Sequence, residues 1–600
     1  MSWMRSSFGY VFPAFLAIAS FAQQPAAVPK AITDPKLLVS TNVADLTTYA
    51  LDKFMMTRSI GESSWSPDGK SVVVETNISG RDNLWIVPAD GGWPRQLTIS
   101  DQRQTKPAWS PDGQWIAFQS DKDGNEQWDI FVASPRNGDV VNLTNSPEVS
   151  EESPSWQPRG RLLAITVKAS GAAQEVATLD VLTRRVRKLT NTTSKDVVNS
   201  RPVWSPDGKQ IAYTQASGAD SNVFVVDIET GKSTNLTPHT GEHRYSAAAW
   251  SPDGKNLLVT SNEGASDRVG LLHVASKQIR WLSNGKTTAK AGCFSPDGKR
   301  AAWTLGRDST ETIVIYDLLT KQTQVLPARE GVDSLAGSAT AFSKSGNDLL
   351  YRYSGPTAPD DLWVYDLSTR RSRQITNSLV AGLRPEDMVS PTLVQLPNTG
   401  AHALVYVPHN IIKNAQYPAL IYLADTQFQN SFRALLQYMV NQGYIVVIPD
   451  RPEDAATAAD FIKQNGYVNP KKIILMGRGY GGYLTLASIV KSPDEWAAAV
   501  AVAPDMKSRA GSDDPISVTK IVNTPLLAIA GANDPNLSPG DLQQITNAVK
   551  RNGGSAQLKI YDEEGSPLEH IDNRLDAAKR ISDFIKVQVP SPGCGCELIQ

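Results

Sequence analysis

A motif made of an aromatic residue followed by Ser-Pro-Asp-Gly recurs along the first part of the chain. Complete copies begin at Trp65, Trp109, Trp204, Trp250 and Phe294, and degenerate copies begin at Trp156 and Phe342. Successive aromatic positions lie 44 to 48 residues apart. That period, with each copy rich in short alternating strands, is typical of the blades of a β-propeller. Seven copies therefore predict an all-β, seven-bladed propeller, which we place at residues 45–378.

Each copy carries its own turn chemistry. Proline presets φ, aspartate bonds the nearby backbone, and glycine takes the left-handed conformation. Strands are expected after the turn, as at 114–118 and 129–132, and the last one ends near a Leu-Thr pair such as Leu143-Thr144. We expect the recurrent tryptophan to pack between blades, and we consider stacking on a ligand the less favoured alternative.

From about Ser378 the repeat ends, and apolar strands alternate with helical stretches. The strand candidates are 403–407, 419–423, 444–448, 473–476, 497–502, 526–530 and 556–561, and the helix candidates are 433–441, 455–464 and 576–586. Strands that alternate with helices predict a doubly wound, mostly parallel α/β sheet. We place this second domain at 379–590, followed by a tail at 591–600.

The segment KKIILMGRGYGGYLTLA, residues 471–487, reads as a buried strand, a glycine-dense turn and the start of a helix. This order is the setting of the nucleophile elbow, G-x-S-x-G, in which a serine stands on a strained corner. Here the serine position holds Gly479. The elbow conformation costs about 1–3 kcal/mol for a residue with a Cβ atom, whereas glycine adopts it freely. The sequence therefore predicts an elbow without its nucleophile.

The same glycines allow a second interpretation. Gly477, Gly479 and Gly482 spell G-x-G-x-x-G after a strand, and the next strand ends near Asp505, as in a dinucleotide-binding fingerprint. The motif alone is a weak signal, and it falls deep inside the domain instead of on its first strand. Nucleotide binding at this turn is therefore the least favoured hypothesis.

A propeller of Ser-Pro-Asp-Gly repeats followed by an α/β-hydrolase domain resembles the prolyl oligopeptidase family of serine peptidases. The segments 466–473 and 481–485 are similar to the nucleophile region of that family, and 523–535 is similar to its acid loop. The resemblance implies that Asp534 holds the position of the triad aspartate and Gly479 that of the nucleophile. It also implies that the N–H of Tyr480 is a possible oxyanion donor.

This chain departs from the family pattern at several points of the active site. Residues 573–576 resemble the segment after the catalytic histidine, and counting back from Asn573 puts Ser566 at the histidine position. The His-Gly-Gly-Pro segment that shapes the active-site wall reads Ala-Asp-Thr-Gln at 424–427, and the connection between Asp450 and Ala455 is short. A serine nucleophile needs a histidine base oriented by an acid, and loss of the nucleophile alone costs about 10⁶ in turnover.

These departures predict a pseudo-peptidase that binds a peptide or protein, either in the cleft between the domains or on the propeller face. The alternative is an active serine-type peptidase or esterase with relocated catalytic residues. His570 is the only histidine after Asp534, and His402 and His409 fall outside the required Ser-Asp-His order. Ser566 could be a displaced nucleophile, but its loop predicts no helix N-terminus to stabilise an oxyanion, so each substitute is disfavoured.

The remaining features limit the partners and the compartment. A net charge of −2 gives no basic footprint for nucleic acid or for an anionic membrane surface. Residues 1–22 combine Arg5, an apolar run at 8–19 and a small-x-small site at 20–22, which is typical of an export signal. We therefore expect a linker at 23–44 and a periplasmic or extracellular protein with no membrane span after signal removal. A retained N-terminal anchor is the alternative.

Three cysteines occur in the chain. Cys293 lies in a strand-like segment and is expected to be a buried thiol. Cys594 and Cys596 lie in the tail, which we expect to be disordered; a redox pair or a metal corner is the alternative, but two ligands do not make a zinc site. We expect no metal and no cofactor.

Overall fold

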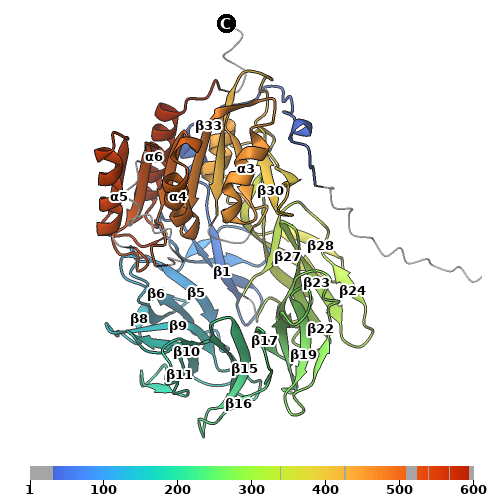
Figure 1. The fold of residues 1–600 in the computed structure, drawn as a ribbon. Coiled ribbons are helices and arrows are strands. Elements are labelled where there is room, and N and C mark those ends of the chain that lie inside the picture. Colours follow the sequence, from blue (N-terminus) through green and yellow to red (C-terminus); the bar gives the residue numbers. More distant parts are fainter. Residues whose placement is uncertain are drawn as a thin grey trace, which may run out of the picture.

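The structure is a computed structural model that describes residues 31–337, 340–424, 428–507, 523–537, 539–566 and 568–593. Strands in the first part of the chain form a ring of blades, and a layered α/β domain stands on one face of the ring (Figure 1). The predicted architecture, an all-β propeller followed by an α/β-hydrolase domain, is confirmed. The export signal, Cys594 and Cys596 lie outside the described residues.

Seven four-stranded antiparallel blades follow one another along the chain, as the seven motif copies predict. The last two blades also share a parallel bridge between Glu311 and Val332. The strands, blade by blade, are β1 (Ile60–Trp65), β2 (Ser71–Thr76), β3 (Asn83–Pro88), β4 (Arg95–Gln96); β5 (Gln104–Trp109), β6 (Ile116–Ser120), β7 (Asp129–Ala133), β8 (Val140–Asn142); β9 (Val149–Trp156), β10 (Leu162–Ala169), β11 (Glu175–Asp180), β12 (Val186–Lys188); β13 (Val197–Trp204), β14 (Gln210–Ser217), β15 (Asp220–Asp227), β16 (Ser233–Asn235); β17 (Tyr245–Trp250), β18 (Asn256–Ser261), β19 (Arg268–His273), β20 (Ile279–Trp281); β21 (Ala289–Phe294), β22 (Arg300–Arg307), β23 (Thr310–Asp317), β24 (Thr323–Val325); β25 (Val332–Leu335), β26 (Asp348–Gly355), β27 (Ala358–Asp366) and β28 (Arg371–Gln374).

The Ser-Pro-Asp-Gly motif forms the turn between the first and second strands of a blade. In the first copy, the Ser66 hydroxyl donates to Asp68 at 2.6 Å, the same carboxylate accepts the N–H of Lys70 at 3.0 Å, and Gly69 has φ +71°. The hydroxyl of Ser66 and the N–H of Lys70 lower the pKa of Asp68. The first strand of a blade usually ends at the motif aromatic and so comes before the turn. The sequence analysis predicted strands only after each turn and therefore missed this first strand.

The motif tryptophans join neighbouring blades through their indole N–H groups. The Nε1 atoms donate to the carbonyl of the residue just before the aromatic of the preceding blade. The pairs are Trp65 to Ala341 (2.9 Å), Trp156 to Ala108 (2.9 Å), Trp204 to Ser155 (2.9 Å) and Trp250 to Val203 (3.0 Å). The first of these pairs joins the first blade to the last, and so helps to close the ring.

Side chains from the last blade close the ring at two further points. Arg352 donates to the carbonyl of Ile60 at 2.9 Å, and Arg373 donates to that of Ala89 at 2.8 Å. Apolar side chains of the two blades pack together in one cluster that includes Trp65. The seam therefore combines packing with hydrogen bonds between side chains and backbone.

The α/β domain has an eight-stranded sheet in the order β29-β30-β32-β31-β33-β34-β35-β36. The pairs β29–β30 and β30–β32 are antiparallel, and all other pairs are parallel. The strands are β29 (Thr392–Gln395), β30 (His402–Tyr406), β31 (Tyr417–Leu423), β32 (Ile445–Pro449), β33 (Val468–Arg478), β34 (Ala498–Val502), β35 (Leu526–Gly531) and β36 (Ala556–Tyr561).

Helices cover both faces of this sheet, and each face has its own apolar core. Helices α3 (Ala455–Ile462), α4 (Tyr480–Lys491) and α5 (Pro539–Arg551) pack on one face. Helices α1 (Leu51–Met55), α2 (Ala434–Asn441) and α6 (Ile571–Gln588) pack on the other. Four 3₁₀ turns occur in the described chain, η1 (Pro35–Leu37), η2 (Pro385–Asp387), η3 (Pro452–Asp454) and η4 (Pro493–Glu495).

Three details differ from the sequence prediction or extend it. The closing helix begins at Ile571, five residues before the predicted start. The described part of the predicted linker lies against the α/β domain, where Leu38 is buried in the core and Ile32 bridges to Val394. Cys293 is fully buried, as expected, and burial raises the pKa of its thiol to about 12.

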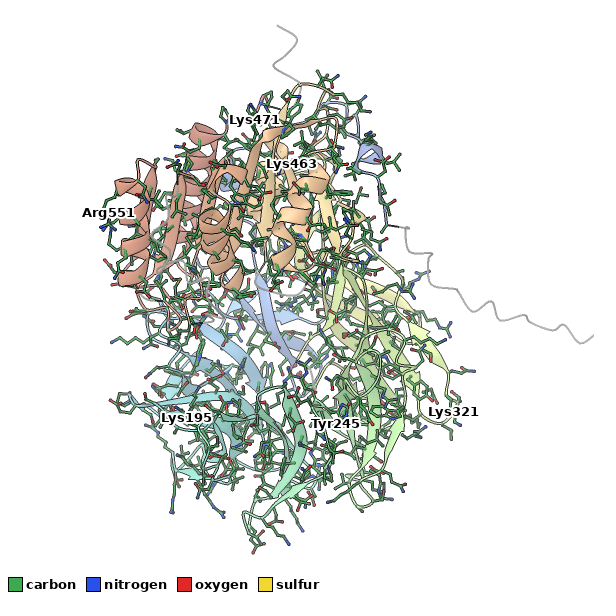
Figure 2. The ribbon with its side chains drawn as sticks, viewed as in Figure 1. Lys195, Tyr245, Lys321, Lys463, Lys471 and Arg551 are labelled. Carbon is green, nitrogen blue, oxygen red and sulfur yellow. The ribbon has the colours of Figure 1, made fainter. Side chains whose placement is uncertain are left out.

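The direction of the strands decides where a site can form. Lys471, near the start of β33, lies at the end of the α/β domain that points away from the propeller (Figure 2). The strand therefore runs towards the propeller, and its carboxyl end at Arg478 faces that domain. Ligands of open α/β sheets bind at the carboxyl ends of parallel strands.

No helix in the described part of the chain is long and apolar enough to cross a membrane.

We expect Trp204→Phe to lower the free energy of unfolding by about 1 kcal/mol, because it removes the hydrogen bond to Ser155 but keeps an aromatic ring. Trp109→Phe is the matched control. Its Nε1 is buried and has no hydrogen-bond partner among the described residues, so loss of that N–H should cost less. Chemical unfolding followed by circular dichroism measures both variants, and equal losses would contradict the role of the indole bond.

Candidate functional site

The turn between β33 and α4 has the geometry of a nucleophile elbow. Gly479 has φ +57° and ψ −125°, a conformation that side chains with a Cβ atom disfavour. Its N–H donates to the carbonyl of Val502 at 3.1 Å, and its own carbonyl accepts the N–H groups of Tyr483 (3.1 Å) and Asp505 (3.0 Å). The turn is thus fixed on both sides, and the residue at its apex has no side chain.

The flanking glycines are explained by close packing within the same turn. A Cβ on Gly477 would lie 2.1 Å from the carbonyl oxygen of Gly481, and one on Gly481 would lie 2.2 Å from that of Leu423. A Cβ on Gly482 would lie 3.0 Å from the carbonyl oxygen of Val502. The strand, the turn and the helix therefore require these glycines for steric reasons, whatever the turn binds.

Asp534, which the resemblance puts at the position of the triad acid, lies in the loop after β35. It is 5 % exposed, and its carboxylate accepts the N–H of Asn536 at 2.8 Å. Burial and the nearby charge of Asp505 raise the pKa of Asp534, while the Asn536 N–H and the cations Arg478 and Lys507 act against this shift. Asp534 is thus held in a site where its charge is partly balanced by Arg478.

Ser566 lies in the loop between β36 and α6, and this loop packs beside the Asp534 loop. The N–H of Asn533 donates to the carbonyl of Glu564 at 2.9 Å, and a Cβ on Gly531 would lie 2.2 Å from the same oxygen. Arg478 donates to the carbonyl of Ser566 at 3.5 Å. The structure therefore brings the loops of Asp534 and Ser566 together with Arg478, the residue that precedes Gly479.

Tyr480 opens α4, so its N–H belongs to the first turn, where N–H groups have no partner within the helix. That N–H therefore needs an acceptor from outside the helix, and its role as an oxyanion donor stays a prediction. Its ring stacks on Tyr483 with the centroids 6.2 Å apart. Burial and the neighbouring Glu453 raise the pKa of Tyr480. In the predicted wall segment 424–427, residues 425–427 lie outside the described residues.

The three candidate histidines have partners elsewhere. The Nδ1 atom of His570 lies 2.9 Å from the carboxylate of Glu564, and its Nε2 lies 2.7 Å from Arg81 of the propeller. His402 lies 3.8 Å from Asp450, and His409 lies 3.1 Å from the carbonyl of Met388. The ring of His570 therefore links the two domains through Arg81.

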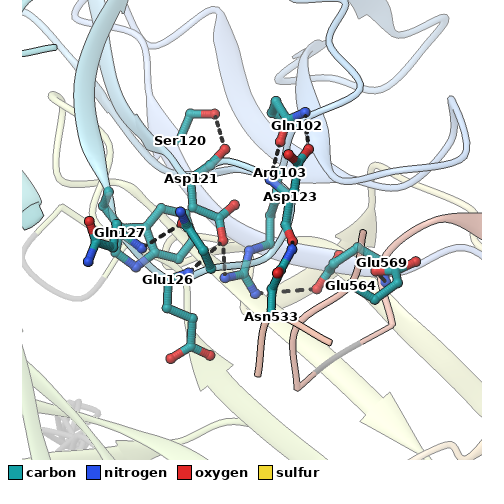
Figure 3. Close-up of polar contacts among 12 residues, drawn as sticks. Gln102, Arg103, Ser120, Asp121, Asp123, Glu126, Gln127, Asn533, Glu564 and Glu569 are labelled. Carbon is teal, nitrogen blue, oxygen red and sulfur yellow. Dashed lines mark hydrogen bonds and ion pairs between the residues drawn. The ribbon is translucent and has the colours of Figure 1, made fainter. Parts of the chain in front are cut away.

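A cluster of ionic side chains joins the propeller to the Ser566 loop (Figure 3). Arg103, on the propeller, lies 3.0 Å from Asp121 and 3.3 Å from Glu569. Asn533 donates to the carbonyl of Asp123 at 2.8 Å, and the N–H of Ile571 donates to that of Gly80 at 3.0 Å. These contacts place the candidate site directly against the propeller.

Glu564 is the centre of the loop on the α/β side of this cluster. Its side chain is fully buried and accepts four N–H groups, from the backbone of Glu569 and His570, from the ring of His570 and from the amide of Asn573, at 2.8 to 3.0 Å. Sequence reasoning missed Glu564, Arg81 and Arg103. Only the position of Glu564, directly before Gly565 and two residues before Ser566, could have drawn attention to it.

No metal site is built among the described residues, because no group of three or more His, Cys, Asp or Glu side chains there could hold an ion.

Acidic side chains of the propeller lie near Asp534. Burial raises the pKa of Glu126, and the charges of Asp534, Asp121 and Glu152 add to this shift while Arg103 opposes it. The propeller side of the site is therefore rich in carboxylates.

Comparison with known proteins agrees with this geometry. A family model described as the TolB β-propeller domain matches residues 39–201 and 192–311, and one described as the prolyl oligopeptidase family matches residues 450–517. Dipeptidyl-peptidase 5 of Porphyromonas gingivalis is 25% identical over 529 residues, covering 72% of this chain and 75% of that relative. Dipeptidyl-peptidase 5 of Porphyromonas endodontalis is 24% identical, with 85% and 82% covered.

Solved structures show the same fold. A structure from a study of two prolyl endopeptidases aligns with a TM-score of 0.78 at 15% identity, covering 90% of this chain and 91% of that one. A puromycin-hydrolyzing peptidase of Mycobacterium tuberculosis aligns with a TM-score of 0.75 at 15% identity, covering 93% and 98%. Fold and site thus define a peptidase-like protein made of a propeller and an α/β-hydrolase domain. The match over residues 450–517 and the two dipeptidyl-peptidase 5 relatives support the prolyl oligopeptidase family for this chain.

We expect Gly479→Ala to lower the free energy of unfolding by about 1–3 kcal/mol, because a Cβ atom is strained at its φ and ψ. Gly466→Ala is the control. A Cβ there meets no atom within 4 Å, so the change should be neutral or should stabilise by at most about 1 kcal/mol. Thermal and chemical unfolding measure both variants. A neutral Gly479→Ala would show that the elbow relaxes to another conformation.

The stability of the domain contact should depend on pH through Glu569. Burial, and then the charge of Asp82, raise the pKa of Glu569, and the cations Arg103 and Arg81 oppose this shift. A carboxyl with a raised pKa contributes stability that is present below its unfolded pKa and lost as pH rises through its folded pKa. We therefore expect the melting temperature to rise on acidification from about pH 8 to about pH 5.

In Glu569→Gln this rise should be smaller, and at about pH 8 the variant should be at least as stable as the wild type. Glu563→Gln, an exposed position on the same loop, controls for the change in net charge. Melting curves over this pH range test the expectation. An unchanged slope in Glu569→Gln would show that other carboxyls dominate.

Proposed function

We propose that this protein is an exported member of the family that binds a peptide or protein without cleaving it. The main support is Gly479, which stands at the apex of an otherwise intact elbow. No side-chain hydroxyl at that apex means no attacking oxygen, and acyl transfer by the family mechanism needs one. The signal-like residues 1–22 support export.

The state of the other two triad positions supports the same proposal. Asp534 is present and buried, but Ser566 stands where an imidazole would be needed. Arg478 reaches the Ser566 loop, and a guanidinium cannot act as a general base because it stays protonated. His570 is held by Glu564 and Arg81. The base of a triad therefore has no counterpart among these residues.

A hollow between the domains supports binding at the interface. It has a volume of about 260 Å³ and lies between the sixth blade and residues 428–429. Lys290 and Glu311 line it from the propeller, and Phe428 and Gln429 line it from the α/β domain. Ligand sites favour such concave places at domain interfaces. We therefore place the peptide or protein ligand in the inter-domain cleft, with the propeller face as the alternative.

Activity-based labelling tests the loss of catalysis. We expect the purified protein to show no covalent labelling by a fluorophosphonate probe and no turnover of prolyl, alanyl or acyl-ester substrates, because the elbow has no hydroxyl. A family member with an intact triad serves as the positive control. Labelling of any residue in the second half of the chain, together with turnover, would support the alternative of a peptidase or esterase with relocated residues.

A restored dyad tests how much of the site has changed. We expect Gly479→Ser combined with Ser566→His to give little or no peptidase activity, because 424–427 lacks the His-Gly-Gly-Pro wall and Arg478 remains beside the new imidazole. The single variants are controls for folding, and melting temperature is measured for all three. Activity close to that of ordinary family members would show that only two residues had been lost.

A further inference from the structure

A pocket of about 280 Å³ opens beside the elbow, on the face of the sheet that α2 and α6 cover. Arg478 and Val502 line it from the ends of β33 and β34, and Ser566 lines it from the loop that would carry the histidine. The pocket therefore includes the histidine position of the triad. It is separate from the hollow between the sixth blade and residues 428–429.

Three arginines line this pocket: Arg433, Arg478 and Arg574. The described residues that line it include no aspartate or glutamate. Arg433 and Arg574 form no salt bridge within the described chain, whereas Arg478 interacts with the charge of Asp534 and donates to Ser566. The Nε atom of Arg433 is buried and has no hydrogen-bond partner among the described residues. A buried donor of this kind favours an acceptor from a ligand.

The start of α2 adds further positive potential at the same place. Arg433 is the N-cap residue of this helix, and no side chain caps the first turn. Ala434, Leu435 and Leu436 of that turn line the pocket. First-turn N–H groups have no partner within a helix, and helix N-termini favour negative charge. Together with the arginines, this end of the pocket is suited to an anion.

The rest of the pocket is apolar. Met55, Leu436, Met476, Leu568 and Ile581 contribute its lining, and Tyr422 lies with its ring centroid 5.8 Å from the guanidinium of Arg433. A small hydrated anion such as phosphate would leave these side chains in contact with water. An organic carboxylate instead suits both the arginines and the apolar lining of the pocket. Its oxygens pair with guanidinium groups, and its stem buries apolar surface.

We propose that this pocket binds the C-terminal carboxylate of a peptide whose last side chain is apolar. That the ligand is a peptide rests on the proposed function. That it carries a carboxylate and an apolar stem is inferred from the residues that line the pocket. Arg433 and Arg574 bind the carboxylate, and Arg478, held towards Asp534 and Ser566, fixes the wall between the pocket and the elbow. The peptide chain leaves the pocket past Ser566 towards the cleft between the domains.

Three probes test this assignment on the full-length protein: acetyl-Ala-Ala-Leu with a free carboxylate, the same peptide as its C-terminal amide, and hexanoate. Titration calorimetry measures their binding. We expect the peptide acid to bind at least about tenfold more tightly than the amide, because the amide loses charge-assisted bonds to the arginines. Hexanoate should bind more weakly than the peptide acid, because it lacks the peptide groups.

Single substitutions locate the site. Arg433→Gln and Arg574→Gln should each weaken binding of the peptide acid by about 10- to 100-fold and leave the amide almost unaffected. Arg580→Gln is the matched control, since this arginine lies on the same helix but is exposed and paired with Asp576 at 2.7 Å. Arg574→Lys keeps the charge without the forked geometry and should give an intermediate loss. Melting temperatures confirm that each variant is folded.

The outcomes separate this proposal from the broader one. Equal binding of acid and amide, unchanged by the arginine substitutions, would overturn the pocket assignment but leave peptide binding in place. Binding of hexanoate without either peptide would overturn the peptide ligand and count against the proposed function too. No binding of any probe by the folded wild-type protein would overturn the assignment as a whole.

Discussion

The candidate site depends on one buried carboxylate, that of Glu564. A carboxylate removed from water is tolerated only if its oxygens are well paired, and Glu564 takes four N–H groups from its own loop and the start of α6. The loop therefore cannot shift without leaving a buried charge unpaired. One residue later, a Cβ on Gly565 would lie 2.1 Å from the carbonyl oxygen of Gly124. The position of Ser566 and the contact between the domains are thus set by the same short segment.

This arrangement divides the charges of the site into two regions. Carboxylates gather on the propeller side, where Glu126 lies within electrostatic reach of Asp121, Glu152 and Asp534. Arg81 and Arg103 are also on the propeller side, where they contact His570, Asp121 and Glu569. Three further arginines line the pocket that Ser566 also lines, and no carboxylate of the described residues lines it with them. Arg478 stands between the two regions and supplies the positive charge near Asp534 that an imidazolium supplies in a working triad. The buried acid is therefore partly neutralised by Arg478, and the residue at the predicted histidine position is Ser566.

The sequence predicted those parts of the structure that depend on neighbouring residues. The blades follow from the turn chemistry of a repeat, and the α/β sheet follows from strand and helix patterns that need no long-range information. The glycine-dense turn between β33 and α4 likewise follows from adjacent residues, and Gly479 has the φ and ψ of an elbow. The assignment of Gly479 to the nucleophile position stays a prediction. The role of Glu564 could not be predicted, because its partners are fixed only when α6 begins at Ile571 and the loop folds back. The pairing of Arg81 with His570 joins positions 489 residues apart, and no local pattern encodes it.

The backbone shape of the elbow is explained by close packing, which does not depend on catalysis. Gly477 and Gly481 allow β33 and α4 to approach each other and β31 so closely that any Cβ would overlap a carbonyl oxygen. These contacts are necessary for the fold whether or not the apex carries a hydroxyl, and glycine at the apex avoids about 1–3 kcal/mol of the backbone strain that a Cβ atom would bring. The residue before the apex, Arg478, is a long cation that donates to the carbonyl of Ser566 and lines the pocket proposed for a carboxylate. Its guanidinium therefore forms the wall between the elbow and that pocket.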